Sequence, residues 1–435
     1  MIQIIKTDSF RREEILPEPA EREEIGNAVR SILSDVKERG DEAVKYYTKL
    51  FDHAELTGPL TAGADEIAKG AAAAAPELLD ALKRAAENIY RFHEKQKQNG
   101  YTVLETEGIV TGQRVIPLKT VGIYVPGGTA RYPSTVLMNC IPAKIAGVEK
   151  LLITTPPDRD GNVPPEILAA AFVAGADCII KAGGAQAIGA LAYGTQSIPR
   201  ADKIVGPGNA YVAEAKRQIQ GLADTDMIAG PSEILIVADD KNDPEITAMD
   251  LLSQAEHDKM AAAVLVTDSE AFALRVADAL ERLIPSLPRR EIARASIDRN
   301  GKIIVTSSIR TAIAAANEIA PEHLELCIDD PFGSLSLVRN AGSVFLGRHC
   351  PEAVGDYYAG PNHTLPTGGT ARFSSPLSVE DFVKKSAFTY YTADALKKAC
   401  PDIVTIAEAE GLQAHGRSVS MRCAYNRQGK GETDS

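Results

Sequence analysis

The chain has 435 residues, a formal net charge of −12, abundant Ala and Gly, and no Trp. This length exceeds one ordinary hydrophobic core, so two or three domains are expected. The acidic balance argues against nucleic acid or an anionic membrane as the main partner. No apolar run approaches the roughly 20 residues that span a bilayer.

The N-terminal segment and the cysteines indicate a cytoplasmic protein. "MIQIIKTDSF" lacks the basic region and apolar core of a signal peptide. The six cysteines are scattered and form no C-x-x-C motif. They fit reduced, mostly buried thiols better than disulfides or a thiolate metal site.

The first third of the chain changes from helix to strand. Residues 20–100 carry a long apolar period of 3.6 residues, as in "APELLDALKRAAENIYRF", which predicts helices. The β-branched residues and turns of "VTGQRVIPLKTVGIYVPGG" then predict short strands.

Two α/β sets follow. Between about 124 and 237, helices and strands alternate, and "AGVEKLLIT" is echoed by "AGADCIIKA". A second set, from 234 to about 347, has the predicted strands "ILIVAD", "AAVLVTD", "KIIVTSS" and "SVFLG". Such alternation predicts right-handed crossovers and parallel sheets with both faces covered. Residues 355–375 read as a long functional loop, and the last 60 residues read as helical.

The predicted fold is therefore α/β, with two Rossmann-like parallel-sheet domains, a small N-terminal element and a helical C-terminal tail. We expect residues 20–100 to pack with the second α/β set, which makes that domain discontinuous. We expect residues 1–19 and 101–122 to form the small element, 20–100 and 233–377 one Rossmann-like domain, 123–232 the other, and 378–435 the tail.

Polar residues with catalytic chemistry occur at several separate places. In "DLLSQAEHD", Gln254 and His257 are three residues apart, so a helix would place them on one face, either as a hydrogen-bonded pair or around a bound group. In "APEHLEL", Glu322 and His323 could divide two proton transfers, or could simply be exposed polar residues.

Two further candidates complete a possible metal set. Asp356 lies in the Gly-bounded stretch "GDYYAGPNH", and His415 follows Glu410 by five residues in the tail. With Gln254 and His257 they offer an amide oxygen, two imidazoles and a carboxylate, which suit Zn²⁺ or Mn²⁺. Several Gly-rich turns, such as "VGPGNAYV", could meet a phosphate or be simple tight turns, and none is a G-x-G-x-x-G fingerprint.

Eight blocks, in order along nearly the whole chain, closely resemble the histidinol dehydrogenase family. They are "VGIYVPGGTARYPSTVLMNCIPAKIAGV", "GGAQAIGALAYGT", "KIVGPGNAYVAEAKRQ", "AGPSEIL", "DLLSQAEHD", "APEHLEL", "GDYYAGPNHTLPTGGTARFSSPLSV" and "EGLQAHGRSV". The resemblance implies a homodimeric enzyme with one Zn²⁺ per subunit. It implies oxidation of L-histidinol through histidinaldehyde to L-histidine with two NAD⁺, at the end of histidine biosynthesis.

The resemblance also assigns roles to residues of this chain. It implies His323 as the base and Glu322 as its partner, with the zinc templating the substrate. The resemblance implies that zinc binds to Gln254, His257, Asp356 and His415, and that NAD⁺ contacts Tyr124, Gln186 and Asn209. It implies substrate contacts from Ser232, Gln254, His257, His323, Asp356, Glu410 and His415. The tail would cross to the partner subunit and complete its active site.

Two alternatives stay open. One is a paralogous zinc and NAD enzyme for another small polar alcohol, such as a sulfonated diol. Glu410 speaks against it, because a carboxylate favours a cationic substrate and repels a sulfonate. The other is a catalytically inactive binding protein on the same fold, which the presence of Glu322, His323 and all four candidate ligands disfavours.

Overall fold

The chain forms two compact units. The computed structural model describes residues 2–16, 23–127, 131–228 and 230–428. We call Met1–Lys97 together with Leu118–Phe382 the core unit, and Gln98–Pro117 together with Val383–Ser435 the C-terminal unit. The core unit contains two six-stranded sheets, and the C-terminal unit contains one three-stranded sheet.

The first sheet has the strand order β2-β7-β6-β5-β8-β9. Its strands are β2 (Thr61–Ala62), β5 (Thr120–Tyr124), β6 (Lys150–Thr155), β7 (Cys178–Lys181), β8 (Lys203–Val205) and β9 (Asp224–Thr225). All pairs are parallel except β2 with β7. The chain moves outward from β5 through β6 to β7, and then returns to β8 on the other side. Such a reversal opens a crevice at the carboxyl ends of β5 and β8, where ligands of α/β sheets commonly bind.

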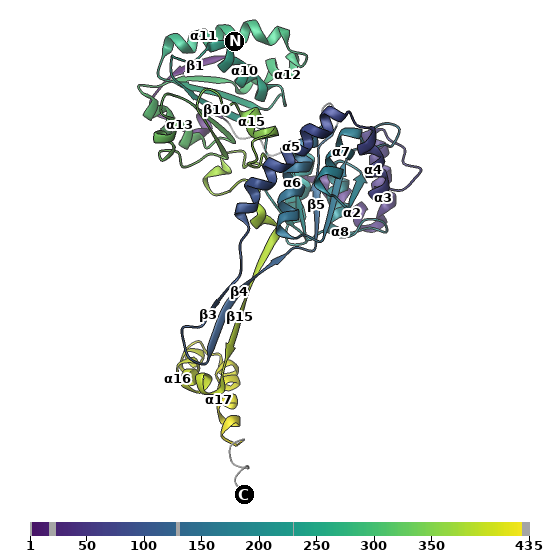
Figure 1. The fold of residues 1–435 in the computed structure, drawn as a ribbon, viewed down its shortest axis with the longest axis vertical. Coiled ribbons are helices and arrows are strands. Elements are labelled where there is room, and N and C mark those ends of the chain that lie inside the picture. The colour runs from purple at the N-terminus through teal and green to yellow at the C-terminus, as the bar shows by residue number, and fades with distance from the viewer. Residues whose placement is uncertain (1, 17–22, 128–130, 229, 429–435) are drawn as a thin grey trace. The chain divides into compact units, whose positions relative to one another are not determined.

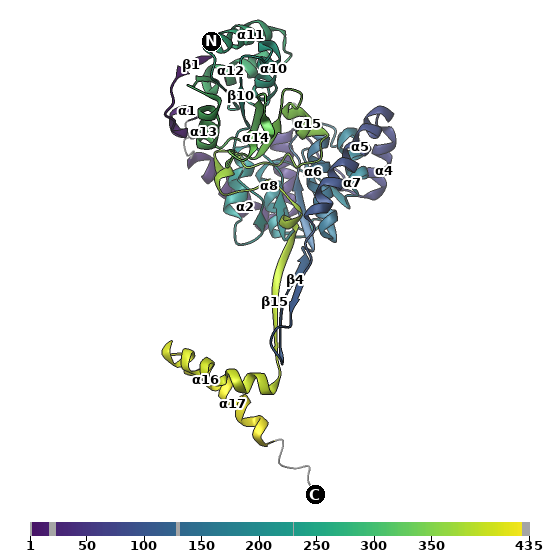
Figure 2. The same cartoon turned by 60° about the vertical axis from the view of Figure 1, so that its left-hand side comes forward.

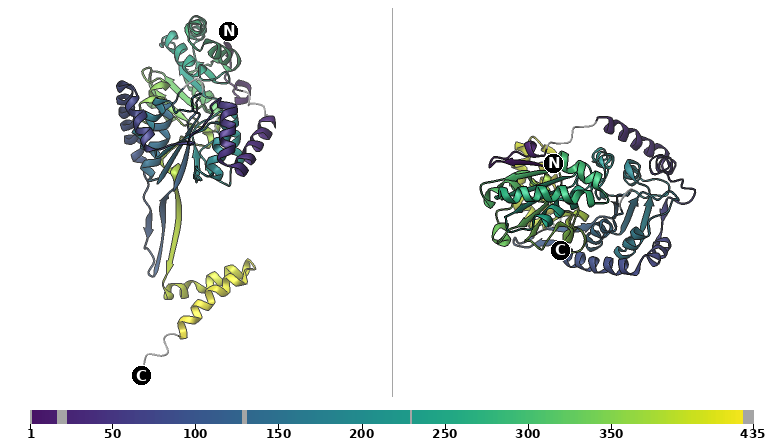
Figure 3. Two further views of the ribbon diagram at one scale, coloured as in Figure 1. Left: turned by 90° about the vertical axis from the view of Figure 1, so that its right-hand side faces the viewer. Right: turned by 90° about the horizontal axis from the view of Figure 1, so that it is seen from above.

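Two groups of helices cover this sheet on opposite faces (Figures 1 and 3). One group is α2 (Glu23–Arg39), α3 (Asp41–Tyr47), α8 (Gly184–Tyr193) and α9 (Ala210–Gln218). The other is α4 (Ala64–Ala73), α5 (Pro76–His93), α6 (Pro133–Ala146) and α7 (Pro165–Ala174). The helices α2 to α5 of residues 20–100 pack on α6 to α9. This differs from the predicted grouping of 20–100 with 233–377, because their apolar faces match the helices of this sheet.

The second sheet is entirely parallel, with the order β1-β12-β11-β10-β13-β14. Its strands are β1 (Gln3–Lys6), β10 (Glu233–Ala238), β11 (Ala262–Thr267), β12 (Lys302–Val305), β13 (His323–Cys327) and β14 (Ser343–Leu346). The edge strand β1 pairs with β12. The predicted grouping of 1–19 with 101–122 is therefore not what the structure has, since β1 completes this sheet.

Helices also cover both faces of the second sheet. Alternate residues of β10 enter different cores: Ile234 and Ile236 pack in one, and Leu235 and Val237 in the other. The first core contains α10 (Pro244–Ala255), α11 (Glu270–Leu283) and α12 (Arg290–Asn300); the second contains α13 (Ile309–Ile319) and residues at the end of α1 (Arg12–Ile15). Two short helices follow the last strands, α14 (Pro331–Leu335) and α15 (Glu352–Tyr357).

The C-terminal unit is an antiparallel ribbon followed by two helices (Figure 2). Its sheet pairs β15 (Val383–Tyr391) with β4 (Ile109–Pro117), and β4 with β3 (Tyr101–Val103). The helices are α16 (Ala393–Ala409) and α17 (Gln413–Gln428), which pack on each other. The predicted helical tail thus begins with a nine-residue strand. No helix among the described residues combines the length and apolarity needed to cross a membrane.

Candidate functional site

His323 is the first residue of β13, which lies between β10 and the edge strand β14 of the second sheet, and it is almost fully buried. Its neighbour in register is Ile234 of β10. The site is therefore at the amino ends of two parallel strands, where β10 and β13 both begin. Behind the imidazole, the Phe345 ring lies roughly parallel to it, with ring centroids 6.0 Å apart.

The backbone of Glu233 holds both members of the predicted catalytic pair. The Glu233 amide N–H donates to Glu322 Oε2 at 2.9 Å. The Glu233 carbonyl oxygen lies 3.1 Å from His323 Nδ1. The Glu322 Oε2 and His323 Nδ1 atoms are 3.7 Å apart. One residue of β10 therefore fixes the carboxyl and the imidazole relative to each other.

Gln254 defines which nitrogen of His323 carries hydrogen. The amide orientation that satisfies all its partners donates to Glu352 Oε1 at 3.1 Å and turns the oxygen toward the Glu233 N–H, also at 3.1 Å. That oxygen is 3.2 Å from His323 Nδ1. Because Nδ1 faces two oxygen acceptors, it is the N–H atom, and Nε2 is left to exchange protons.

Asp356 lies on the other side of the imidazole. Its Oδ1 is 3.3 Å from His323 Nε2. Burial alone would lower the pKa of His323, but Glu322, Glu352 and Asp356 outweigh it and raise that pKa well above its usual value. Burial is the largest single influence on the pKa of Asp356 and raises it, but the hydrogen bond with His323 and the charges of His323, His363 and His257 together lower it by more, so the net pKa of Asp356 is depressed.

Buried acids surround the pair. Burial raises the pKa of Glu322 to about 8, and it does the same for Glu352 and Glu325. The Glu352 N–H donates to Glu325 Oε1 at 2.8 Å. Glu325 and Glu352 could not be identified as site residues from the sequence, because nothing in a linear sequence shows that acids on β13 and α15 converge.

Arg12 and Glu233 form a second pair that sequence reasoning missed. The Arg12 Nη2 atom is 2.6 Å from Glu233 Oε1, and both side chains are at most 13% exposed. Arg12 also donates to the carbonyl oxygen of Ile319. This pair fixes the side chain of the residue whose backbone holds Glu322 and His323. The block "AGPSEIL" contains Glu233, but nothing in it indicates a partner more than two hundred residues away.

The predicted metal ligands of the core unit lie near one another. Gln254 is buried in the last turn of α10, and His257 lies in the turn that follows, with its N–H donating to the Gln254 carbonyl at 3.1 Å. The expected helix thus ends before His257. Burial lowers the pKa of His257, and the carboxylate of Asp356 partly opposes this. Asp356 lies in the short helix α15 and not in a loop as expected.

His363 ties the Asp356 segment to the first sheet. Its Nδ1 atom lies 2.9 Å from the Asp356 carbonyl oxygen, and its Nε2 atom lies 3.3 Å from Thr135 Oγ1 in the first turn of α6. Beside it, Asn362 donates to the carbonyl oxygen of Met138 at 2.6 Å. The segment that carries Asp356 is therefore attached to a helix that follows the central strand of the other sheet.

The predicted cofactor residues occupy the carboxyl edge of the first sheet. Tyr124 ends β5, and its hydroxyl accepts a hydrogen bond from the Gly184 N–H at 3.0 Å. Gln186 is fully buried in α8, and neither atom of its amide has a hydrogen-bond partner. Asn209 caps α9, since its Oδ1 accepts from the N–H groups of Tyr211 and Val212. Residues 128–130 of the "YVPGGTA" turn are outside the described residues.

The remaining predicted substrate residues lie in both units. Ser232 immediately precedes β10 and is partly exposed. Glu410 caps the C-terminal end of α16, and His415 lies in the first turn of α17. Both are exposed within the C-terminal unit. Gln254, Asp356, Glu322 and His323 therefore come together in the core unit, and Glu410 and His415 belong to the other unit.

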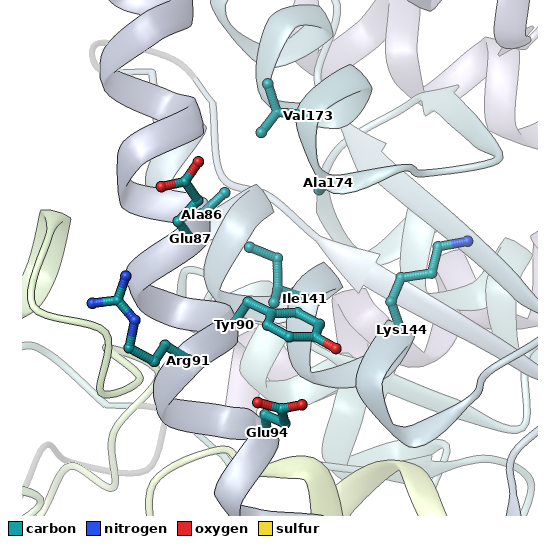
Figure 4. Close-up of a pocket in the computed structure, with 9 residues that line it drawn as sticks. All are labelled: Ala86, Glu87, Tyr90, Arg91, Glu94, Ile141, Lys144, Val173 and Ala174. Carbon is teal, nitrogen blue, oxygen red and sulfur yellow. The ribbon is translucent and has the colours of Figure 1, made fainter.

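A cavity of about 430 Å³ reaches His257. Its lining includes Tyr132 and Pro133 at the start of α6, and Tyr357 at the end of α15. A larger hollow of about 580 Å³ lies between α5, α6 and α7, where the Tyr90 ring lies near Ile141 (Figure 4). None of the predicted site residues lines this larger hollow, so the cavity at His257 is the one that bears on the chemistry.

The donor types fit zinc and a dinucleotide. Gln254, His257 and Asp356 offer an amide oxygen, an imidazole and a carboxylate, all ligands that Zn²⁺ accepts. Among the described residues, no group of three or more His, Cys, Asp or Glu side chains is arranged to hold a metal. Among the predicted ligands, the core unit supplies two residues of those types, His257 and Asp356, and one amide, Gln254. The unpaired amide of Gln186 fits a polar ligand, since buried polar atoms normally have partners.

A buried acid–base pair on one sheet and a topological switch point in the other are features of an α/β enzyme. A family model described as histidinol dehydrogenase matches residues 17–423. The chain belongs to the histidinol dehydrogenase family, whose members are NAD-dependent enzymes of histidine biosynthesis.

Individual relatives agree over nearly their whole length. A histidinol dehydrogenase of Bacillus cereus (strain ATCC 14579) is 53% identical over 400 residues, which are 92% of this chain and 93% of that protein. One from Clostridium acetobutylicum is 49% identical over 97% of this chain and 99% of its own. The crystal structure of histidinol dehydrogenase from Elizabethkingia anophelis superposes with a TM-score of 0.91, at 41% identity, and covers 98% of this chain and 99% of its own.

Proposed function

We propose that this protein oxidises L-histidinol through L-histidinaldehyde to L-histidine and reduces two NAD⁺. Each oxidation removes a hydride from carbon and releases one proton, and one water adds to the aldehyde between them. The observation that supports this proposal is the arrangement around His323. Asp356 lies 3.3 Å from its Nε2 atom, and Gln254 lies 3.2 Å from its Nδ1 atom. The Glu322 carboxyl is 3.7 Å from Nδ1.

His323 is proposed as the base of both oxidations. Its Nδ1 faces the Glu233 carbonyl and the Gln254 amide, so the ring cannot turn without losing those contacts. This leaves Nε2 as the nitrogen proposed to take the proton of the alcohol, and later that of the aldehyde hydrate, once Asp356 no longer holds a proton on it. Glu322 is its proposed partner in activating water. Its pKa of about 8 lets it exchange a proton near neutral pH.

We propose that the protein binds zinc and NAD⁺ through different residues. One Zn²⁺ per subunit, bound by Gln254, His257, Asp356 and His415, would supply a Lewis acid that holds the imidazole and amine of the substrate. Tyr124, Gln186 and Asn209 are proposed to contact NAD⁺. The proposed substrate contacts are Ser232, Gln254, His257, His323, Asp356, Glu410 and His415.

We further propose a homodimer in which the tail of each subunit completes the active site of the other. Few apolar residues of the C-terminal unit are buried, and Ile406 and Met421 are 61% and 71% exposed, which supports a further partner surface. The six free cysteines support a reducing, cytoplasmic location.

Activity, metal and stoichiometry can be tested together. Chelator-treated protein would be assayed for NADH formation with L-histidinol, with and without added Zn²⁺, and histidine would be counted against NADH. We expect zinc-dependent histidine formation at about two NADH per substrate. Turnover of a sulfonated diol but not histidinol would favour the paralogous enzyme, and zinc binding without NAD⁺ reduction would favour an inactive binding protein.

The shared active site can be tested by mixing subunits. His323→Asn and His415→Asn would each be inactive alone. A mixed dimer would contain one site in which both residues are intact, because the defects lie on different subunits. With random exchange, half of the dimers are mixed, so about a quarter of wild-type activity should return. No recovery despite proven subunit exchange would mean that the tail acts on its own subunit.

A further inference from the structure

A buried ion pair lies next to the proposed cofactor residues and has no role in the mechanism above. Lys216 of α9 and Asp226, which follows β9, approach to 2.6 Å, and their side chains are only 2% and 1% exposed. Burying two charges carries a desolvation cost that their attraction often does not exceed. The pair therefore raises the question of what it holds in place.

Both partners hold the same residue of the backbone. The Lys216 ammonium donates to the Gly206 carbonyl oxygen at 2.5 Å. The Gly206 N–H donates to Asp226 Oδ2 at 2.8 Å. A single ion pair thus satisfies the carbonyl and the amide of one glycine, in a segment directly after β8 that belongs to no helix or strand.

Gly206 is where the two proposed cofactor segments meet. Its φ is +107°, a conformation that residues with a side chain rarely adopt. A Cβ atom there would be 2.1 Å from the carbonyl oxygen of Tyr124. The turn "GPGN" therefore runs against the end of β5 and reaches Asn209 three residues later. This is the switch point between β5 and β8.

We propose that Lys216 and Asp226 are positioning residues for NAD⁺. By fixing both polar groups of Gly206, they hold Asn209 in register with Tyr124 at the carboxyl ends of β5 and β8. They do not touch the cofactor themselves. This inference rests on the proposed NAD⁺ contacts of Tyr124 and Asn209, and it names residues that hold those contacts in place.

The test is a separation of KM from kcat. Lys216→Met removes the donor to the Gly206 carbonyl. We expect the KM for NAD⁺ to rise about tenfold, as one charge-assisted hydrogen bond is lost. The kcat at saturating NAD⁺ and the zinc content should stay within about twofold of wild type. A residue with a merely structural role would lower thermal stability without this selective change.

A double variant covers the case in which the single variant fails to fold. Lys216→Met with Asp226→Asn leaves no unpaired buried charge and keeps an acceptor for the Gly206 N–H. It still lacks the donor to the Gly206 carbonyl. We expect the double variant to fold and to have an elevated KM for NAD⁺. A wild-type KM in that variant would overturn the proposal.

Lys203→Met is the matched control. Lys203 is also a buried lysine of the first sheet, 3.0 Å from Asp224, but it is at the amino end of β8. The Lys203→Met variant should lose stability and keep the wild-type KM for NAD⁺. A rise in this KM equal to that of Lys216→Met would contradict the proposed positioning role of Lys216 and Asp226. Asn209→Ala separates the two proposals. If Asn209→Ala leaves the KM for NAD⁺ unchanged, the proposed contact of Asn209 with NAD⁺ is wrong. If Asn209→Ala raises this KM and the Lys216 variants do not, only the proposed positioning role of Lys216 and Asp226 is wrong.

Discussion

The proposed functional residues lie at opposite strand ends in the two sheets of the core unit. In the first sheet, Tyr124 closes β5 and Gly206 follows β8, so the proposed cofactor residues gather at carboxyl ends. In the second sheet, Glu233 opens β10 and His323 opens β13, so the acid–base pair is at amino ends. Ligand sites in open parallel sheets usually lie at carboxyl ends, and the second sheet departs from that rule.

The helices explain why the two edges suit different chemistry. A crossover helix runs opposite to its strands, so helices begin at a carboxyl edge and end at an amino edge. The starts of α6, α8 and α9 lie at the first edge, and such ends favour anions such as pyrophosphate. The end of α10, with Gln254 and His257, lies at the second edge and favours cations. The helix ends at the two edges therefore match the charges of the two proposed ligands, the pyrophosphate of NAD⁺ and Zn²⁺.

The largest effect should follow from removing His323, the proposed base at the amino edge. His323→Asn should lower kcat by about 100- to 10,000-fold, because general base catalysis is lost. Zinc content and NADH affinity should change little, since Asn can still donate near the Nδ1 position. The exposed His349 gives the control His349→Asn, which should keep full activity. Loss of zinc from His323→Asn would show that proton transfer and zinc binding at this edge cannot be separated.

The next effect concerns the support of the same edge. Arg12→Met should destabilise the protein by about 3–5 kcal/mol, because it leaves the Glu233 carboxylate buried and unpaired. Adding Glu233→Gln should recover a large part of this loss, as no charge then remains. Urea unfolding of the three proteins measures both. Equal stability of the single and double variants would mean that Arg12 acts by packing and not by pairing.

A variant of the carboxyl edge sharpens the comparison. Gly206→Ala places a Cβ 2.1 Å from the Tyr124 carbonyl oxygen at a φ of +107°. Backbone strain of this kind costs about 1–3 kcal/mol. We expect a rise in the KM for NAD⁺ of about 5- to 150-fold with unchanged zinc content, measured by steady-state kinetics and metal analysis. Gly221→Ala, where φ is also positive but no atom lies within 4 Å of the Cβ, is the matched control.

The last prediction concerns the pH dependence of stability, where replacing one acid should change a slope and not abolish a function. Burial, with the nearby Asp250 charge, raises the folded-state pKa of Glu325 to about 8 from a usual value of 4.5. The folded state therefore keeps a proton that the unfolded state has lost, and stability falls as pH rises from about 4.5 to about 8. Glu325→Gln cannot ionise, so this decline should become shallower. An unchanged slope would show that Glu325 does not contribute to it.

The alternation of strands and helices was predictable because its periods are local. Apolar runs such as "EILIVA" and helices with an apolar face can be seen in any window of ten residues. The partner of each helix could not be predicted in this way. An apolar stripe on α5 fits any apolar surface of the right shape, and the observed partners α6 and α7 lie on a sheet that comes later in the chain.

The site was predictable where motifs carried it, and less so where geometry did. The resemblance named His323, Glu322, Gln254 and Asp356, which lie together. It gave no sign of the Glu233 backbone, whose role depends on the pairing of β10 with β13. The spacing of Gln254 and His257 indicated a common helical face, whereas α10 ends at Ala255. The i, i+3 proximity survives because a turn hydrogen bond continues past the helix end.

The Glu233 main chain also sets a limit on what genetics can reveal. Its amide and carbonyl orient Glu322 and His323, and every amino acid except proline would supply the same two groups. A library of substitutions at position 233 would therefore report on the carboxylate and its Arg12 partner, and would pass over the peptide unit itself. Only backbone chemistry, such as an amide-to-ester replacement at this residue, would expose it. Mutational tolerance and functional importance can thus be opposite at the same residue.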